Sequence, residues 1–449
     1  MAGSSILEGN SFRADAGERL GERAAALIDD RARLLGPAYR LFYSRPVHLV
    51  RGEGTYLYDA DGVEYLDVFN NVPAVGHGNE RVAQAVGAQA ATLNTHTRYL
   101  LDGLTAYADD LLGTMPGLDQ VMFTNSGSES NDLAIRVARA ATGGTGIIVT
   151  SEAYHGTSYL TSGASPAMGE GFALLPEVRV IPAPDTYRLG DDAVDAASLG
   201  AWMAARYREA VDSLADAGLK PAALLLDSIM ASDGVFPDPR GFLAPVLDAV
   251  HGSGAMWIAD EVQTGLARVG DAMWGFERHG IVPDLVTCGK AMGNGIPVSA
   301  MAARSEVLAP FATRVPYFNT FGGNPVSIAA AQAVLDEIRD RDLMASAAKV
   351  GAVLRDGIRA IAADHPRLAD VRGTGLYNAV EVVRDPATRV ADTDAALALV
   401  NALRERRVLV SPSGPASNVI KVRPPLVFGM REAERFLTEL AGAASDLGL

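Results

Sequence analysis

The chain has 449 residues, of which 48% are hydrophobic, so it can bury a large core and form more than one lobe. Its 54 acidic residues outnumber the 39 Lys and Arg, and the formal net charge of −15 disfavours nucleic acid as a partner. The single cysteine, Cys288, excludes an intrachain disulfide, and no segment reaches the roughly 20 apolar residues of a membrane helix, so we expect a cytoplasmic protein without membrane contact.

The predicted elements begin with a helix over residues 15–35, which Gly36 and Pro37 end. Turn residues then separate three short strands of a predicted β-meander, over 47–50, 56–58 and 64–69. We expect residues 1–70 to form an N-terminal segment, a helix and a small meander, that packs with a smaller domain.

From about residue 80 the chain alternates between helical patterns and short apolar strands, at 120–123, 146–149, 178–181, 222–226, 256–259 and 285–287. This alternation predicts an α/β fold with a mostly parallel sheet, helices on its faces and the functional site at the carboxyl ends of the strands. We expect a large α/β/α domain over 71–325. A smaller C-terminal α/β domain should cover 326–449, with strands near 376–383 and 419–422.

A turn rich in small polar residues, Asn125 to Asn131, follows the strand at 120–123 and opens an amphipathic helix. The free N–H groups of a helix start, with the hydroxyls of Ser126 and Ser128, suit a phosphate group. An ordinary serine helix cap explains the same residues, and is the commoner use of such a turn.

Two charged residues follow later strands of the same predicted sheet. Asp260 ends the strand at 256–259, where a buried carboxylate needs a cation such as a pyridinium nitrogen, although it could equally cap the next helix. Lys290 lies in a glycine-rich turn after the strand at 285–287, where its amine could condense with an aldehyde and transfer protons. A lone lysine after a strand is usually structural, so this interpretation depends on the three sites occurring together.

Together with Tyr154-His155-Gly156 and the segments 260–265, 289–290 and 319–325, these residues resemble the class III aminotransferase family, over about 47–425. The resemblance implies the fold type I architecture, a large mostly parallel α/β/α domain and a smaller C-terminal one, with pyridoxal 5′-phosphate as cofactor. It implies that Lys290 carries this cofactor as a Schiff base.

The resemblance also implies a role for each matching position. Gly127 and Ser128 would hold the cofactor phosphate, Tyr154 would stack on the ring, and Asp260 would pair with the pyridine nitrogen. Val262 and Gln263 would contact the other ring face and the phenolic oxygen. Thr320 would reach the cofactor phosphate of a neighbouring subunit, which implies a homodimer with shared active sites and leaves a tetramer open. The predicted cofactor-binding set is Ser126, Gly127, Ser128, Tyr154, His155, Asp260, Val262, Gln263, Lys290 and Thr320.

The family supports both transamination and elimination. In relatives that bind a substrate carboxylate, an arginine stands at the position of Thr157. The sequence therefore does not predict this carboxylate contact. The segments 41–43, 70–77 and 93–100 resemble the ethanolamine-phosphate phospho-lyases, which eliminate phosphate and release ammonia and acetaldehyde. We therefore predict a small phosphorylated amine as substrate, with the candidate binding residues Tyr43, Asn71, His77, Arg98, Lys421 and Arg423.

Several alternatives stay open from the sequence. Arg98 and Arg423 could make structural ion pairs, and His77 could be a satisfied turn histidine. The enzyme could be an ω-transaminase acting on a primary amine or β-amino acid, or it could accept a longer phosphorylated amine such as phosphohydroxylysine. A cofactor-binding regulator without catalysis is disfavoured because Lys290 and Asp260 are both present. Asp227 departs from the glutamate usual in relatives.

Overall fold

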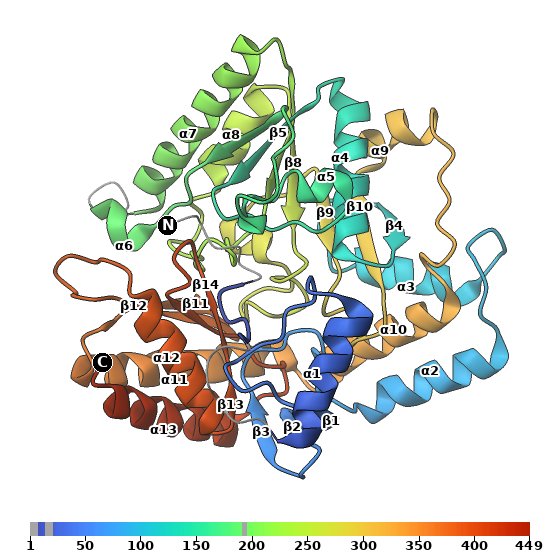
Figure 1. The fold of residues 1–449 in the computed structure, drawn as a ribbon. Helices are drawn as coiled ribbons and strands as arrows, with labels where there is room; N and C mark the ends of the chain where they lie inside the picture. The colour runs from blue at the N-terminus through green and yellow to red at the C-terminus, as the bar shows by residue number, and fades with distance from the viewer. Residues whose placement is uncertain (1–7, 14–20, 191–194) are drawn as a thin grey trace.

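A computed structural model of the chain describes residues 8–13, 21–190 and 195–449. Figure 1 shows a large sheet wrapped by helices in one half of the molecule and a region formed by the C-terminal helices and smaller sheets in the other. None of the helices in these ranges is long and apolar enough to cross a membrane.

The large sheet has seven strands in the order β4-β10-β9-β8-β7-β5-β6. Neighbouring strands from β9 to β6 run parallel, which agrees with the mostly parallel sheet expected from the sequence. Its strands are β4 Gln120–Thr124, β5 Gly146–Thr150, β6 Val178–Ile181, β7 Pro221–Leu226, β8 Met256–Asp260, β9 Leu285–Cys288 and β10 Ser299–Ala303.

Strand β10 is absent from the predicted elements, and it runs antiparallel to both of its neighbours, β4 and β9. Its sequence, Ser-Ala-Met-Ala-Ala, lacks the β-branched and aromatic side chains that mark a strand. All of its residues are buried, so tertiary packing overrides the weak local preference.

A second sheet has the order β1-β2-β3-β13. Its first three strands pair antiparallel, which confirms the predicted meander, while β13 from the C-terminal region pairs parallel with β3. The predicted third strand stops early because the Asp67 side chain accepts the N–H groups of Phe69 and Asn70 and turns the chain. The strands are β1 Leu49–Glu53, β2 Tyr56–Asp59, β3 Glu64–Asp67 and β13 Val408–Leu409.

The third sheet is antiparallel throughout, in the order β11-β12-β15-β14. The strands predicted near 376–383 and 419–422 are β12 and β15. Strand β11, with Asp370, Arg372 and Gly373, was not predicted because charged residues and glycine are uncommon in strands. The strands are β11 Leu368–Thr374, β12 Tyr377–Val382, β14 Ser411–Ser413 and β15 Val419–Val422.

Helices cover the faces of these sheets (Figure 1). Helix α1 begins at Glu22, whereas the predicted helix began at 15, and residues 14–20 lie outside the described ranges. The helices are α1 Glu22–Leu35, α2 Glu80–Thr92, α3 Asp102–Leu112, α4 Gly127–Thr142, α5 Tyr159–Ser162, α6 Thr186–Leu189, α7 Ala196–Asp216, α8 Ala244–Gly252, α9 Ser305–Ala312, α10 Pro325–Asp340, α11 Leu343–Asp364, α12 Thr393–Glu405 and α13 Met430–Leu447, with 3₁₀ turns η1 Pro166–Met168 and η3 Gly275–His279.

The central strands of the large sheet are fully buried, because helices cover both faces. The central parallel strands are apolar on both faces, and this buried packing fixes the positions of the ends of β8 and β9. The polar residues that follow these ends, including Asp260 and Lys290, meet at the carboxyl edge of the sheet.

Candidate active site

A cavity of about 120 Å³ lies where β8 and β9 end and α4 begins. The structure brings to it eight of the predicted cofactor residues, from four separate stretches of chain. They are Gly127, Ser128, Tyr154, His155, Asp260, Val262, Gln263 and Lys290, and Asn131, Gly156 and Asp227 also line the cavity.

The start of α4 is capped by Ser126 and also lines the cavity, so the helix cap is confirmed and the phosphate-binding role stays a prediction. The Ser126 hydroxyl accepts the N–H of Glu129 (3.3 Å), so Ser126 is the helix cap. Gly127 and Ser128 follow the cap and line the cavity. The cavity thus meets the positive end of a sixteen-residue helix, where an anionic group is favoured.

Close packing around this helix start requires glycine at two positions. A Cβ atom at Gly156 would lie 2.4 Å from the Ser128 hydroxyl oxygen, and the backbone there has a φ of +135°, which L side chains rarely adopt. A Cβ at Gly127 would lie 2.9 Å from a methyl group of Val262. The N–H of Thr157 donates to the Ser128 hydroxyl (3.0 Å), so this turn is tied to α4.

Asp260 is buried and held in one orientation by three donors. One carboxylate oxygen accepts from Asn131 Nδ2 (2.8 Å) and contacts His155 Nδ1 (2.7 Å), while the other accepts the N–H of Val262 (3.1 Å). The Thr287 hydroxyl donates to Asn131 Oδ1 (2.6 Å), which orients the amide. Asp260 is therefore a preorganised carboxylate at the cavity wall rather than a helix cap.

The sequence did not assign Asn131 or Thr287 to this network. Asn131 stands in the recognised turn, on the inner face of α4, and only its buried position reveals the bond to Asp260. An asparagine on the apolar face of a predicted helix was the available signal, because a buried amide needs partners.

Lys290 faces an unusual balance of charges. Burial and the neighbouring Arg423 lower the pKa of its amine to about 8, while Asp260 and Asp227 act in the opposite direction. A lysine with such a pKa carries a usable fraction of neutral, nucleophilic amine near neutral pH.

Arg423, just beyond β15, joins two distant parts of the chain at this cavity. Its guanidinium donates to the side-chain oxygens of Asn71 (2.8 Å) and Gln263 (2.6 Å) and lies over the Phe69 ring. Lys421, on β15, is buried too, and burial with the charges of Arg423 and Lys290 lowers its pKa. Three basic side chains, Lys290, Lys421 and Arg423, thus converge beside the cavity and interact electrostatically.

Asp227, which stands where relatives usually carry a glutamate, forms no ion pair with these three basic side chains. The two carboxylate oxygens of Asp227 accept the N–H groups of Ile229 (3.0 Å) and Ala231 (3.2 Å). Burial and the charge of Asp260 raise the pKa of Asp227. Among the described residues, no carboxylate forms an ion pair with Lys290, Lys421 or Arg423.

The other predicted substrate residues have partners elsewhere. The Tyr43 hydroxyl donates to the Val410 carbonyl (3.0 Å), and His77 Nε2 contacts Asp67 (2.7 Å). Arg98 lies over the Phe318 ring on the surface. Thr320 is exposed as well, so within one chain neither it nor Arg98 lines the cavity at Lys290.

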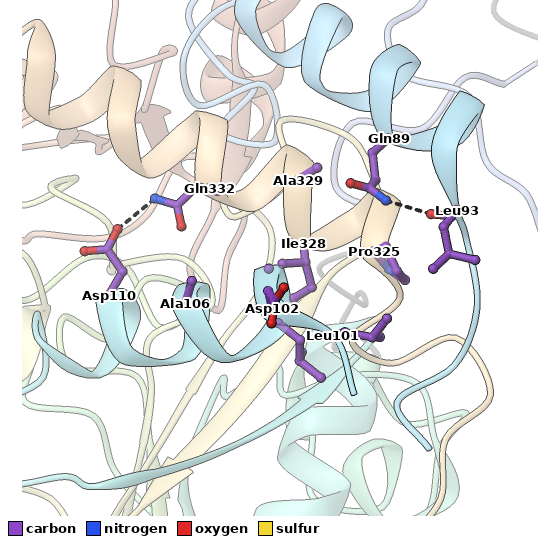
Figure 2. Close-up of a pocket in the computed structure, with 12 residues that line it drawn as sticks. Gln89, Leu93, Leu101, Asp102, Ala106, Asp110, Pro325, Ile328, Ala329 and Gln332 are labelled. Carbon is purple, nitrogen blue, oxygen red and sulfur yellow. Dashed lines mark hydrogen bonds between the residues drawn. The ribbon is translucent and has the colours of Figure 1, made fainter. Parts of the chain in front are cut away.

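A larger cavity, of about 580 Å³, lies between α2, α3 and α10 (Figure 2), and Lys290 is not among its lining residues. Its walls are mainly apolar, with Leu93 and Ile328 among them. Three of its polar side chains are already paired: Gln332 donates to Asp110, and Gln89 donates to the Leu93 carbonyl. No lysine, arginine or histidine lines it, so this space has no cation for an anionic ligand.

The cavity at Lys290 fits a ligand with a phosphate, a basic ring nitrogen and an aldehyde. Its glycine-lined helix start suits the phosphate, the fixed Asp260 carboxylate suits a protonated ring nitrogen, and the Lys290 amine suits the aldehyde. Pyridoxal 5′-phosphate combines these groups.

Comparison with known proteins gives two kinds of relative. Residues 42–443 match the family described as Aminotransferase class-III. A Drosophila melanogaster protein named alanine–glyoxylate aminotransferase 2-like is 40% identical over 412 residues, covering 90% of this chain and 83% of that protein. The Caenorhabditis elegans ethanolamine-phosphate phospho-lyase homolog 1 is 35% identical over 431 residues, covering 92% of each. An Arthrobacter phospholyase solved in complex with phosphoethanolamine has a TM-score of 0.90 at 39% identity, covering 93% of this chain and 99% of that one.

Proposed function

The chain belongs to the class III aminotransferase family and is a pyridoxal 5′-phosphate-dependent enzyme of fold type I, and from this premise we propose that it eliminates phosphate from ethanolamine phosphate. One molecule of water is consumed, and acetaldehyde, ammonia and phosphate are the products. The substrate bound in the similar Arthrobacter phospholyase supports this choice.

The observation that carries the proposal is that two buried basic side chains, Lys421 and Arg423, form no ion pair with a carboxylate of the described residues. Both side chains are buried, and Arg423 donates hydrogen bonds to the neutral amide oxygens of Asn71 and Gln263. Burying a cation without a counter-ion is costly, so such a pair favours an anionic substrate group. A phosphate dianion supplies the missing charge and accepts several charge-assisted bonds.

When bound, pyridoxal phosphate supplies a ring that accepts the electron pair of a carbon that loses a proton. The Lys290 amine takes that proton from the carbon bearing the substrate nitrogen, since its low pKa leaves part of it neutral. The Asp260 carboxylate, which His155 and Asn131 hold in one orientation, would pair with the protonated ring nitrogen. Lys421 and Arg423 stabilise the phosphate as it leaves the adjacent carbon with the C–O electron pair.

The experiment that tests the proposal is incubation of the purified holoenzyme with ethanolamine phosphate, with phosphate and acetaldehyde measured in parallel. Equal amounts of the two products are expected. Phosphohydroxylysine serves as a second substrate, because a longer amine would use the same phosphate-binding cations.

The second candidate function is an ω-transaminase reaction, which the 40% identical relative named an aminotransferase favours. Thr157 provides no cation for a substrate carboxylate, which argues for the lyase. If the enzyme releases no phosphate but converts an amine and pyruvate to a carbonyl product and alanine, the transaminase assignment replaces the lyase.

We also propose that two copies of the chain share their active sites. The 93–101 loop and the 313–324 segment touch through Arg98 and Phe318, and they expose large apolar side chains such as Leu100 and Phe321. An exposed apolar surface of this kind favours burial against a partner. A second copy seated there would bring Thr320 and Arg98 toward the neighbouring Lys290 cavity, from which they are absent within one chain.

A further inference from the structure

A second charged cavity, of about 420 Å³, lies between α11, β11 and the loops around 238–240 and 269–271. It is a different cavity from the one at Lys290, and the two have no lining residue in common. Five arginines line it: Arg240, Arg278, Arg355, Arg359 and Arg372.

Most of these arginines have acidic partners. Asp271 pairs with both Arg240 and Arg278, and Asp238 also pairs with Arg278. Those two aspartates are the acidic residues of the cavity lining, so the lining carries more positive than negative charge. The remaining pairs, Arg359 with Asp356 and Arg372 with Asp370 and Glu381, use acids outside the lining.

Arg355 differs from the other four. Its guanidinium donates to the neutral Asn378 Oδ1 (3.0 Å), and no carboxylate in the described ranges forms an ion pair with it. Burial, and to a smaller extent the charges of Arg359 and Arg278, lower the pKa of Arg355, while Asp238 and Asp356 act in the opposite direction. The Arg355 guanidinium has further N–H groups that can donate. Helix α11, rather than a flexible loop, positions this side chain.

We propose that this cavity binds a small oxyanion with two or more negative charges, held by Arg355 and its arginine neighbours. Guanidinium groups bind phosphate and carboxylate oxygens through paired, charge-assisted bonds, so both phosphate-type and polycarboxylate ligands share the required chemistry. The volume admits several linked oxyanion groups rather than a single one.

Calorimetric titration of the holoenzyme with pyrophosphate, and separately with citrate, tests the site. Because pyrophosphate also suits the cations beside Lys290, the titrations use the Arg423→Gln background, in which that site is weakened. We expect one binding event per chain, at least tenfold weaker when Arg355→Gln is added. Binding of pyrophosphate alone assigns a phosphate-type ligand, and binding of citrate alone a polycarboxylate.

Two control variants distinguish the loss of charge in the cavity from a general effect on folding. Arg355→Lys keeps the charge and should retain measurable binding, whereas Arg208→Gln removes an exposed arginine on α7, outside the cavity, and should change nothing. Binding that is absent in the Arg423→Gln enzyme, or equally strong after Arg355→Gln, would overturn the proposal. Neither result depends on whether the enzyme releases phosphate from ethanolamine phosphate.

Discussion

We propose that the chemistry depends on Lys290, because it alone among the cavity residues offers an amine next to a fixed carboxylate. Borohydride reduction of the holoenzyme should attach the pyridoxyl group to the peptide that contains Lys290. Lys290→Ala should lose the visible absorbance of the bound cofactor. A labelled peptide from another part of the chain would contradict the assignment.

The protonation of Lys290 predicts a pH dependence with a definite sign. Because its pKa is lowered to about 8, the neutral amine of the apoenzyme should react with an acylating reagent with a midpoint near pH 8. Arg423→Gln removes a cation and should move the midpoint upward, whereas Asp260→Asn removes an anion and should move it downward. Arg208→Gln, on α7, should leave it in place. Shifts of the same sign in both variants would refute the charge balance proposed here.

We expect Asp260 to contribute to turnover through its negative charge rather than through its size. Asp260→Asn retains the size and much of the hydrogen bonding but removes the counter-charge for the ring nitrogen, so turnover should fall by several orders of magnitude while cofactor still binds. A loss of about 4 kcal/mol of transition-state stabilisation would correspond to roughly a thousandfold slower turnover. Single-turnover rates measure this, and activity within about tenfold of wild type would show that the role is misassigned.

Substitution of Lys421 and Arg423 distinguishes the proposed lyase reaction from the transaminase reaction. Lys421→Gln and Arg423→Gln should each raise the KM for ethanolamine phosphate and weaken inhibition by inorganic phosphate, because a charge-assisted bond to the phosphate is lost. The visible spectrum should change little. Arg431→Gln, on the surface of α13, provides the matched charge control. Unchanged KM values in both variants would place the phosphate elsewhere.

At the scale of elements, the packing of the 154–157 turn against the start of α4 shapes the cofactor cavity. Gly156→Ala would place a methyl group against Ser128 in a disfavoured backbone conformation, at a cost of about 1–3 kcal/mol. We expect a lower midpoint of thermal unfolding and weaker cofactor retention in dialysis. Gly171→Ala is the matched control, because its Cβ would meet no atom within 4 Å. Equal behaviour of the two variants would show that this contact does not shape the site.

At the scale of the whole molecule, we predict a dimer. Sedimentation velocity should show an active species of twice the chain mass. Leu100→Glu or Phe321→Glu should weaken this species by placing charge in the proposed contact. Val390→Glu alters an exposed apolar residue in the C-terminal region and should not. An active monomer would contradict the shared-site proposal.

The sequence by itself determined the family and the cofactor, and it predicted eight of the residues that line the cavity at Lys290. This was possible because each of these residues follows a strand or opens a helix, and such boundaries leave local patterns of glycine, polar and apolar residues. The division of the chain at residues 70 and 325 stays a prediction. Strand β10 escaped notice because its small residues carry no strand signal.

Only the tertiary structure decided which polar groups face one another. The contacts of Arg423 with Asn71, of Asp260 with Asn131, and of β13 with β3 join residues far apart in the chain. A local pattern specifies that a side chain is polar or buried but not which distant partner satisfies it. The burial of Lys421 beside other basic groups and the arginine-lined cavity depend on such contacts, so they became visible only when the chain was folded.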